Sequence, residues 1–172
     1  MIRFILFLVS LFCITSGNGQ SVKKYPIGES GCAAYFFCDP GTFNVSYSED
    51  SSKIYTAECI TGETGYGLIC VQLNQVDLKI DDVEPVMLSY LDYLKTLFKV
   101  TSAVGYGKGH RLRGKENIHG IIDYWKDENG MNLKIKSWTD GNFIIFLYAR
   151  SAKELVETKT NVFLDGIQFK GM

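Results

Sequence analysis

Residues 81–100 read DDVEPVMLSYLDYLKTLFKV and carry the clearest helical pattern in the chain. Apolar side chains recur every three or four positions, at Val83, Val86, Met87, Tyr90, Leu91, Leu94, Leu97 and Phe98. This spacing places them on one stripe of an α-helix. Asp81 and Asp82 can cap its first turn, and Pro85 is expected in that turn, where a missing N–H costs little. The stretch therefore predicts one long helix that packs on a sheet.

Two turn dipeptides after this helix predict the register of three strands. Asn129-Gly130 and Asp140-Gly141 are both typical of two-residue hairpin loops. With such loops Tyr124 faces Ile135, and Ile135 faces Phe146. The face that we expect beneath the helix then holds Ile122, Tyr124, Leu133, Ile135, Ile144, Phe146 and Tyr148.

The opposite face of these strands is mixed, because the same register pairs Trp125 with Lys134. It also carries the apolar side chains of Trp138, Phe143, Ile145 and Leu147. Either a second layer covers this face, or it is an exposed aromatic surface of the kind that marks a binding site.

A second helix is the candidate cover. Ser151-Ala152-Lys153-Glu154 fits a capping box, so we expect a helix that begins there and ends at Gly166. Ile167-Gln168-Phe169 could then add a final short strand.

Alternating side chains before the long helix predict a three-strand meander. Its strands are expected at Thr42–Tyr47, Lys53–Ile60 and Tyr66–Leu73, joined by the polar turns SEDSS and TGETG. One face collects Ile54, Thr56, Ile60, Ile69, Val71 and Leu73, and the reverse face collects Tyr55, Ala57, Cys59 and Cys70. Residues 20–31 are punctuated by Pro and Gly and are expected to be irregular, while CAAYFFC (32–38) is a short strand or a half-turn.

The first 19 residues have the pattern of a secretory signal peptide, with Arg3, an apolar run, and Gly17 and Gly19 before a cleavage site. The apolar run is shorter than the roughly 20 residues that span a bilayer, which favours a leader over a membrane anchor. After removal of the signal peptide we expect no stable membrane insertion of the chain. Residues 20–172 are then expected to form a single α+β domain, exported to a periplasm or secreted. They carry 17 Lys and Arg against 19 Asp and Glu, a balance that gives no electrostatic footprint for nucleic acid.

Four cysteines remain after the leader: Cys32, Cys38, Cys59 and Cys70. An even number in an oxidising compartment predicts two disulfides, and four cysteines allow three connectivities. If Cys59 and Cys70 lie on one face of paired strands, they could be bridged, and Cys32 would pair with Cys38 across a loop. No CxxC pair is present, so we expect no metal site.

Residues 105–115, GYGKGHRLRGK, are the candidate anion-binding segment. Glycines let the backbone approach a ligand, and Lys108, His110, Arg111 and Arg113 could supply positive charge. The interpretation that we favour is a flexible, solvated connection between the helix and the sheet. The pattern is not GxGxxG, and the chain has no other motif that predicts a cofactor.

The order βββ-α-βββ-α predicts an α+β fold with an antiparallel sheet of about six strands. This order, the hairpins IIDYWKDENGMNLKIKSWTDGNFIIFLYAR and the closing FLDGIQF resemble the PsbP-like α/β/α sandwich over about residues 40–170. The resemblance implies a non-enzymatic binding or assembly module.

Two functions are therefore carried forward. The first is an exported binding module for an unknown protein or small anionic ligand, with its site around Trp125, Trp138 and Phe143 or at the basic glycine segment. The alternative is a small hydrolase or isomerase of NTF2-like or cystatin-like architecture that uses His110 or His119. The two histidines have no partner motif in the sequence, so the first function is preferred.

Overall fold

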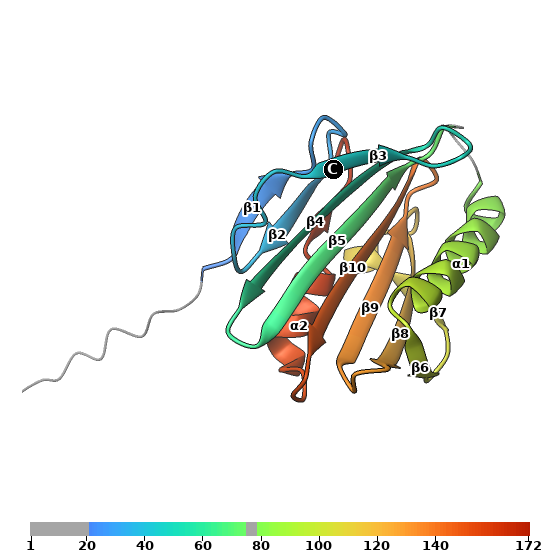
Figure 1. Ribbon diagram of the computed structural model, residues 1–172. Coiled ribbons are helices and arrows are strands. Elements are labelled where there is room, and N and C mark those ends of the chain that lie inside the picture. The colour runs from blue at the N-terminus through green and yellow to red at the C-terminus, as the bar shows by residue number, and fades with distance from the viewer. Residues whose placement is uncertain (1–20, 75–78) are drawn as a thin grey trace, which may run out of the picture.

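The computed structural model describes residues 21–74 and 79–172. The expected signal peptide and residues 75–78 of the loop before the long helix lie outside the described residues. In the described part the chain is α+β, with an eight-stranded and a three-stranded antiparallel sheet and two α-helices (Figure 1).

The larger sheet has the strand order β3-β4-β5-β10-β9-β8, and both β6 and β7 pair with the outer edge of β8. Its strands are β3 (Asn44–Tyr47), β4 (Lys53–Thr61), β5 (Thr64–Gln72), β6 (Val100–Ala103), β7 (Gly107–Arg111), β8 (His119–Asp127), β9 (Asn132–Thr139) and β10 (Phe143–Ser151). A 3-10 turn, η1 (Leu112–Gly114), connects β7 to β8. The predicted sheet is therefore two strands too small, because β6 and β7 are short and depend on pairing with β8.

The smaller sheet contains β1 (Lys23–Pro26), β2 (Ala33–Phe36) and β11 (Ile167–Gln168), with β2 in the centre. The expected final strand is confirmed, but it pairs with β2 rather than with the large sheet. The region expected to be an irregular lead-in forms β1, since its backbone pairs with β2.

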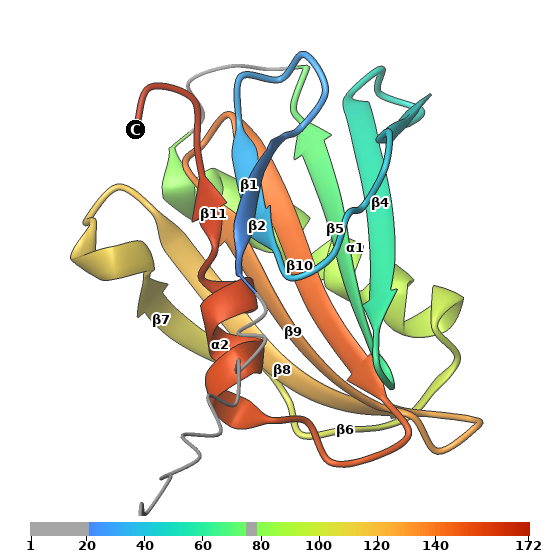
Figure 2. The same ribbon diagram turned by 90° about the vertical axis from the view of Figure 1, so that its left-hand side faces the viewer.

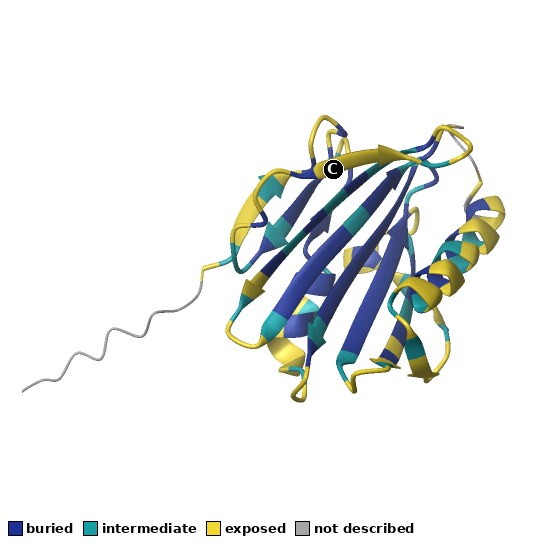
Figure 3. Cartoon of the chain, in the orientation of Figure 1, coloured by how far each residue is buried: buried dark blue, intermediate teal, exposed yellow. Residues whose placement is uncertain are grey.

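The large sheet is covered on both faces. Helix α1 (Ile80–Leu97) lies on one face, and α2 (Glu157–Leu164) lies on the other together with the small sheet (Figure 2). Each face has its own hydrophobic core, and the central strands are almost entirely buried (Figure 3).

Helix α1 confirms the predicted long helix, with Val83, Met87, Leu91 and Leu94 buried against the sheet. Val86 and Leu97, which were expected on the same stripe, are exposed. The helix begins earlier than predicted.

Because of this earlier start, the expected cap is wrong: Lys79 holds the N-cap position, and no side chain caps the helix. Asp81 and Asp82 lie in the first turn, where negative charge complements the helix dipole. Pro85 lies one turn later than predicted, and its missing N–H leaves the Asp81 carbonyl without the usual helical partner.

The predicted register of β8 is wrong by one residue. Tyr124 pairs with Lys134 and Trp125 pairs with Leu133, because the loop at Asn129-Gly130 has three residues instead of two. The Asp127 carboxylate accepts hydrogen bonds from the N–H groups of Asn129 and Met131, both at 2.8 Å, which holds this longer loop. A shift of one residue turns every side chain of β8 to the other face.

The β9–β10 register also differs, but its faces are as predicted. Ile135 pairs with Tyr148 instead of Phe146, a shift of two residues that keeps the same side chains beneath α1. Asp140 begins the wider loop, and its carboxylate accepts hydrogen bonds from the N–H groups of Asn142 and Phe143.

The expected capping box is wrong, although the expected helix end is confirmed. Ser151 is the last residue of β10, since pairing with Thr64 and Asn132 extends that strand. Helix α2 begins only at Glu157, after the N-cap residue Val156, and it ends just before Gly166.

The meander is confirmed: Ile54 pairs with Val71, and Tyr55 pairs with Cys70, as the predicted faces require. The favoured disulfide pairing is wrong, because Cys38 is bonded to Cys59. Cys59 and Cys70 do share a face, but Cys59 lies opposite Tyr66, four residues along β5 from Cys70. That offset is roughly 13 Å, too long for a disulfide.

Candidate functional site

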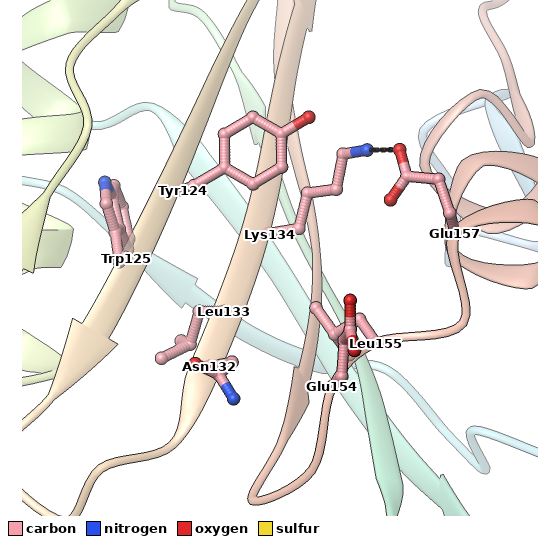
Figure 4. Close-up of a pocket in the computed structure, with 8 residues that line it drawn as sticks. All are labelled: Tyr124, Trp125, Asn132, Leu133, Lys134, Glu154, Leu155 and Glu157. Carbon is pink, nitrogen blue, oxygen red and sulfur yellow. Dashed lines mark hydrogen bonds and ion pairs between the residues drawn. The ribbon is translucent and has the colours of Figure 1, made fainter.

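A cavity of about 280 Å³ opens where β8 and β9 meet the connection from β10 to α2 (Figure 4). Eight residues line it: Tyr124, Trp125, Asn132, Leu133, Lys134, Glu154, Leu155 and Glu157. Trp125 and Leu133 belong to the core beneath α1, so their side chains turn to the other face of the sheet. Tyr124, Lys134 and Leu155 therefore provide the main side-chain walls.

Lys134 is the centre of this cavity, although its side chain is only 3 % exposed. Its ammonium group donates hydrogen bonds to the Glu157 carboxylate and, at 3.0 Å, to Asn161 Oδ1. The same nitrogen lies 4.9 Å from the centre of the Tyr124 ring, a cation–π distance. The positive charge of Lys134 is thus balanced by the carboxylate of Glu157 at the rim of the cavity.

The electrostatics of the pair follow from these contacts. Burial alone would lower the pKa of Lys134, but its interactions with Glu157 and Tyr124 outweigh burial and raise that pKa. The hydrogen bond from Lys134 lowers the pKa of Glu157. Both groups are therefore charged at neutral pH, and the carboxylate of Glu154 leaves the lining with a net negative charge.

The three predicted aromatic site residues are not brought together. Trp125, Trp138 and Phe143 are each at most 4 % exposed, and the register of β8 separates Trp125 from the other two. Trp138 and Phe143 belong to the core beneath α2, where the Trp138 indole donates a hydrogen bond of 2.8 Å to the Leu164 carbonyl. Of the two interpretations of this face, the structure shows the covered one.

The basic glycine segment forms β7 and η1 instead of a loop, and three of its cations have partners on the protein. Lys108 pairs with Glu84 at 2.7 Å, and Arg111 lies 3.9 Å from Glu116. Arg113 donates a hydrogen bond of 3.1 Å to the Asp165 carbonyl. An anion at this segment would have to compete with these contacts, and its binding there stays a prediction.

The two histidines lie on neighbouring strands, with Arg111 and His119 paired in register. His119 Nε2 is 3.1 Å from the Glu116 carbonyl oxygen. Among residues 21–74 and 79–172, neither imidazole is hydrogen-bonded to a carboxylate or a hydroxyl group. The geometry therefore offers no general acid–base pair that would favour the hydrolase or isomerase.

Sequence reasoning missed Tyr124 and Glu157 as site residues. The two-residue loop that Asn129-Gly130 predicts would put Tyr124 beneath α1, whereas the observed loop is one residue longer. Glu157 was placed inside a helix that in fact begins there. The useful signal is the side-chain alternation of β9, which puts Lys134 on the mixed face for which a second helix is the candidate cover.

The described residues contain no cluster of three or more His, Cys, Asp or Glu side chains that could hold a metal ion. Neither α1 nor α2 combines the length and apolar character that a bilayer-spanning helix needs.

No protein-family model matches the chain, and no curated protein matches it.

Proposed function

We propose that the chain is an exported, disulfide-stabilised binding module that holds a small amine with an apolar ring in the cavity beside Lys134. The observation that carries this proposal is the lining of that cavity. Tyr124 and Leu155 offer apolar surface, two carboxylates stand at the rim, and the one cation among the lining residues is neutralised by Glu157. Such a lining favours a cationic ligand over an anionic one.

The contacts suggest how such a ligand would bind. Tyr124 is 44 % exposed, so one face of its ring is available for stacking, while Lys134 occupies the other side. Glu154 is exposed and can pair with an ammonium group. The Asn132 amide donates to the Lys153 carbonyl at 3.3 Å, which fixes the loop that carries Glu154.

Tryptamine and indole-3-acetate provide a direct test, because they share an aromatic ring and differ in charge. We expect tryptamine to bind more tightly, with NMR shift changes centred on Tyr124, Lys134 and Glu154. Tyr124→Ala should weaken tryptamine binding about tenfold, the size of a partly desolvated cation–π and stacking contact.

Tyr93→Ala is the matched control, because Tyr93 is 63 % exposed on α1, on the other face of the sheet. It should leave tryptamine binding unchanged. Equal binding of the two compounds, or shift changes that avoid the cavity, would contradict the proposal.

Export and the PsbP-like relationship are part of the same proposal. The Cys38–Cys59 disulfide is compatible with an oxidising destination, and the sequence of residues 1–19 supports a leader that is removed before Gln20. Helices on both faces of an antiparallel sheet support an α/β/α layering. N-terminal sequencing of the secreted protein tests the leader, since export without cleavage after Gly19 would contradict it.

A further inference from the structure

The remaining described cysteines, Cys32 and Cys70, are thiols in the core beneath α2 and are 2 % and 0 % exposed. Cys32 comes directly before β2, and Cys38 comes two residues after it. Strand β2 therefore has a cysteine at each end, roughly 20 Å apart if the segment is extended. The two ends lie over different parts of the large sheet.

One end of β2 is already tied down. Cys38 is bonded to Cys59 of β4, and the neighbouring Phe37 ring lies 5.5 Å from the ring of Tyr66, which pairs with Cys59. This end of β2 therefore lies above the Cys59–Tyr66 pair.

The other end lies above the Tyr55–Cys70 pair, four residues further along the same two strands. The turn before β2 is closed by a hydrogen bond of 2.9 Å from Ile27 N to the Cys32 carbonyl. Gly28 of that turn rests on the Tyr55 ring so closely that a Cβ atom would be 2.6 Å from Tyr55 Cε1. Cys32 is thereby carried to the end of the sheet that holds Cys70.

The electrostatics agree with this placement. Burial, with a smaller contribution from the charge of Asp140, raises the pKa of Cys32 to about 11. Burial also raises the pKa of Cys70, and the nearby Cys32 and Asp140 add to that increase. The charge of Asp140 therefore acts on the pKa of both thiols, and Cys32 acts on the pKa of Cys70.

We propose that Cys32 and Cys70 form a second disulfide, which ties the start of β2 to β5 as Cys38–Cys59 ties its end to β4. Each thiol loses one hydrogen, and the two electrons pass to a disulfide oxidant such as oxidised glutathione, which is reduced to two thiols. The bond forms before the core closes, because buried protonated thiols react slowly.

Peptide mapping of the full chain, refolded in a glutathione redox buffer, tests the proposal. Free thiols are alkylated, and the denatured, unreduced chain is cut with trypsin and chymotrypsin together. Cleavage after Lys24, Phe37, Lys53 and Tyr66 leaves Cys32, Cys38, Cys59 and Cys70 each on its own peptide. We expect the Cys32 peptide linked to the Cys70 peptide. Recovery of both peptides alkylated, or of either one linked to another cysteine, would overturn the proposal.

Thermal unfolding gives an independent measurement. If the bond exists, Cys32→Ala and Cys70→Ala should each lower the Tm by about 10 °C, and the double variant should lower it no further. Losses that add in the double variant would mean that the two side chains contribute only separate packing. The mapping of the wild-type chain does not depend on whether these variants fold.

Discussion

The ammonium group of Lys95 on α1 lies 3.3 Å from Oδ2 of Asp123 on β8, whose side chain is fully buried. The same carboxylate accepts hydrogen bonds from Gly105 N at 2.9 Å and from Trp125 Nε1 at 2.6 Å. Lys95 also lies 4.0 Å from the centre of the Tyr106 ring. One buried carboxylate thus joins the helix, the sheet and the segment between β6 and β7.

Asp123→Ala should therefore lower the free energy of unfolding by about 3–5 kcal/mol, because it removes the buried partner of Lys95 and the side-chain acceptor of three N–H donors. Urea unfolding measures this loss. Glu128→Gln is the control, since it removes the partner of Lys99 in an exposed ion pair and should cost less than about 1 kcal/mol. Equal losses in the two variants would show that Asp123 is not the structural centre described here.

Trp138 is expected to be structural and not a ligand contact. Trp138→Ala should cost about 3–5 kcal/mol, because it removes a buried ring and the hydrogen bond to Leu164. Gly120→Ala should also destabilise the protein, by about 1–3 kcal/mol, since its Cβ atom would lie 2.3 Å from Trp138 Cζ3. Gly65→Ala is the control, because its Cβ atom would meet the flexible Arg150 side chain. Chemical denaturation measures these losses. A Trp138→Ala variant that is as stable as the wild type would contradict the structural role of Trp138.

The Lys134–Glu157 pair should make stability depend on pH at both ends of the range. Glu157 has its pKa lowered below 4.5, so its contribution is present above that value and is lost as pH falls through the lowered pKa. Lys134 has its pKa raised above 10.5, so its contribution is present below that value and is lost as pH rises through the raised pKa.

Glu157 is 64 % exposed, which limits the effect to about 0.5–1 kcal/mol. Urea midpoints of the wild type and Glu157→Gln should differ at pH 7 and converge towards pH 3. A difference that stays constant over this range would rule out the ion pair as its source.

Loss of the Cys38–Cys59 disulfide should lower the stability by about 3 kcal/mol, because the bond closes a loop with a sequence separation of 21 residues. The double variant Cys38→Ala/Cys59→Ala isolates the contribution of this bond. A reductant can no longer lower the Tm of this variant by breaking Cys38–Cys59. An unchanged Tm relative to the oxidised wild type would show that the bond contributes no stability.

Helix α1 and the β3–β5 meander could be predicted from the amino-acid sequence alone. Both depend on local patterns: a repeat of three to four residues between Val83 and Leu94, and strict alternation around Tyr55 and Val71. Such patterns can be recognised within one segment, because the buried side chains of a helix or strand recur at a fixed spacing along its own sequence. The faces of β9 and β10 were also predictable, since a two-residue error in register leaves the faces unchanged.

The face of β8 and the candidate site depend on contacts between segments that are distant in the sequence. Asn129-Gly130 marks a turn, but the Asp127 carboxylate sets the length of its loop, and one extra residue brings Tyr124 beside Lys134. Glu157 joins them because β10 extends to Ser151 before α2 can begin. The short strands β1, β2, β6 and β7 likewise form through backbone pairing with other segments. Hydrogen bonds between separate segments carry no periodic signal in the sequence, which is why the site appears only when the chain is folded.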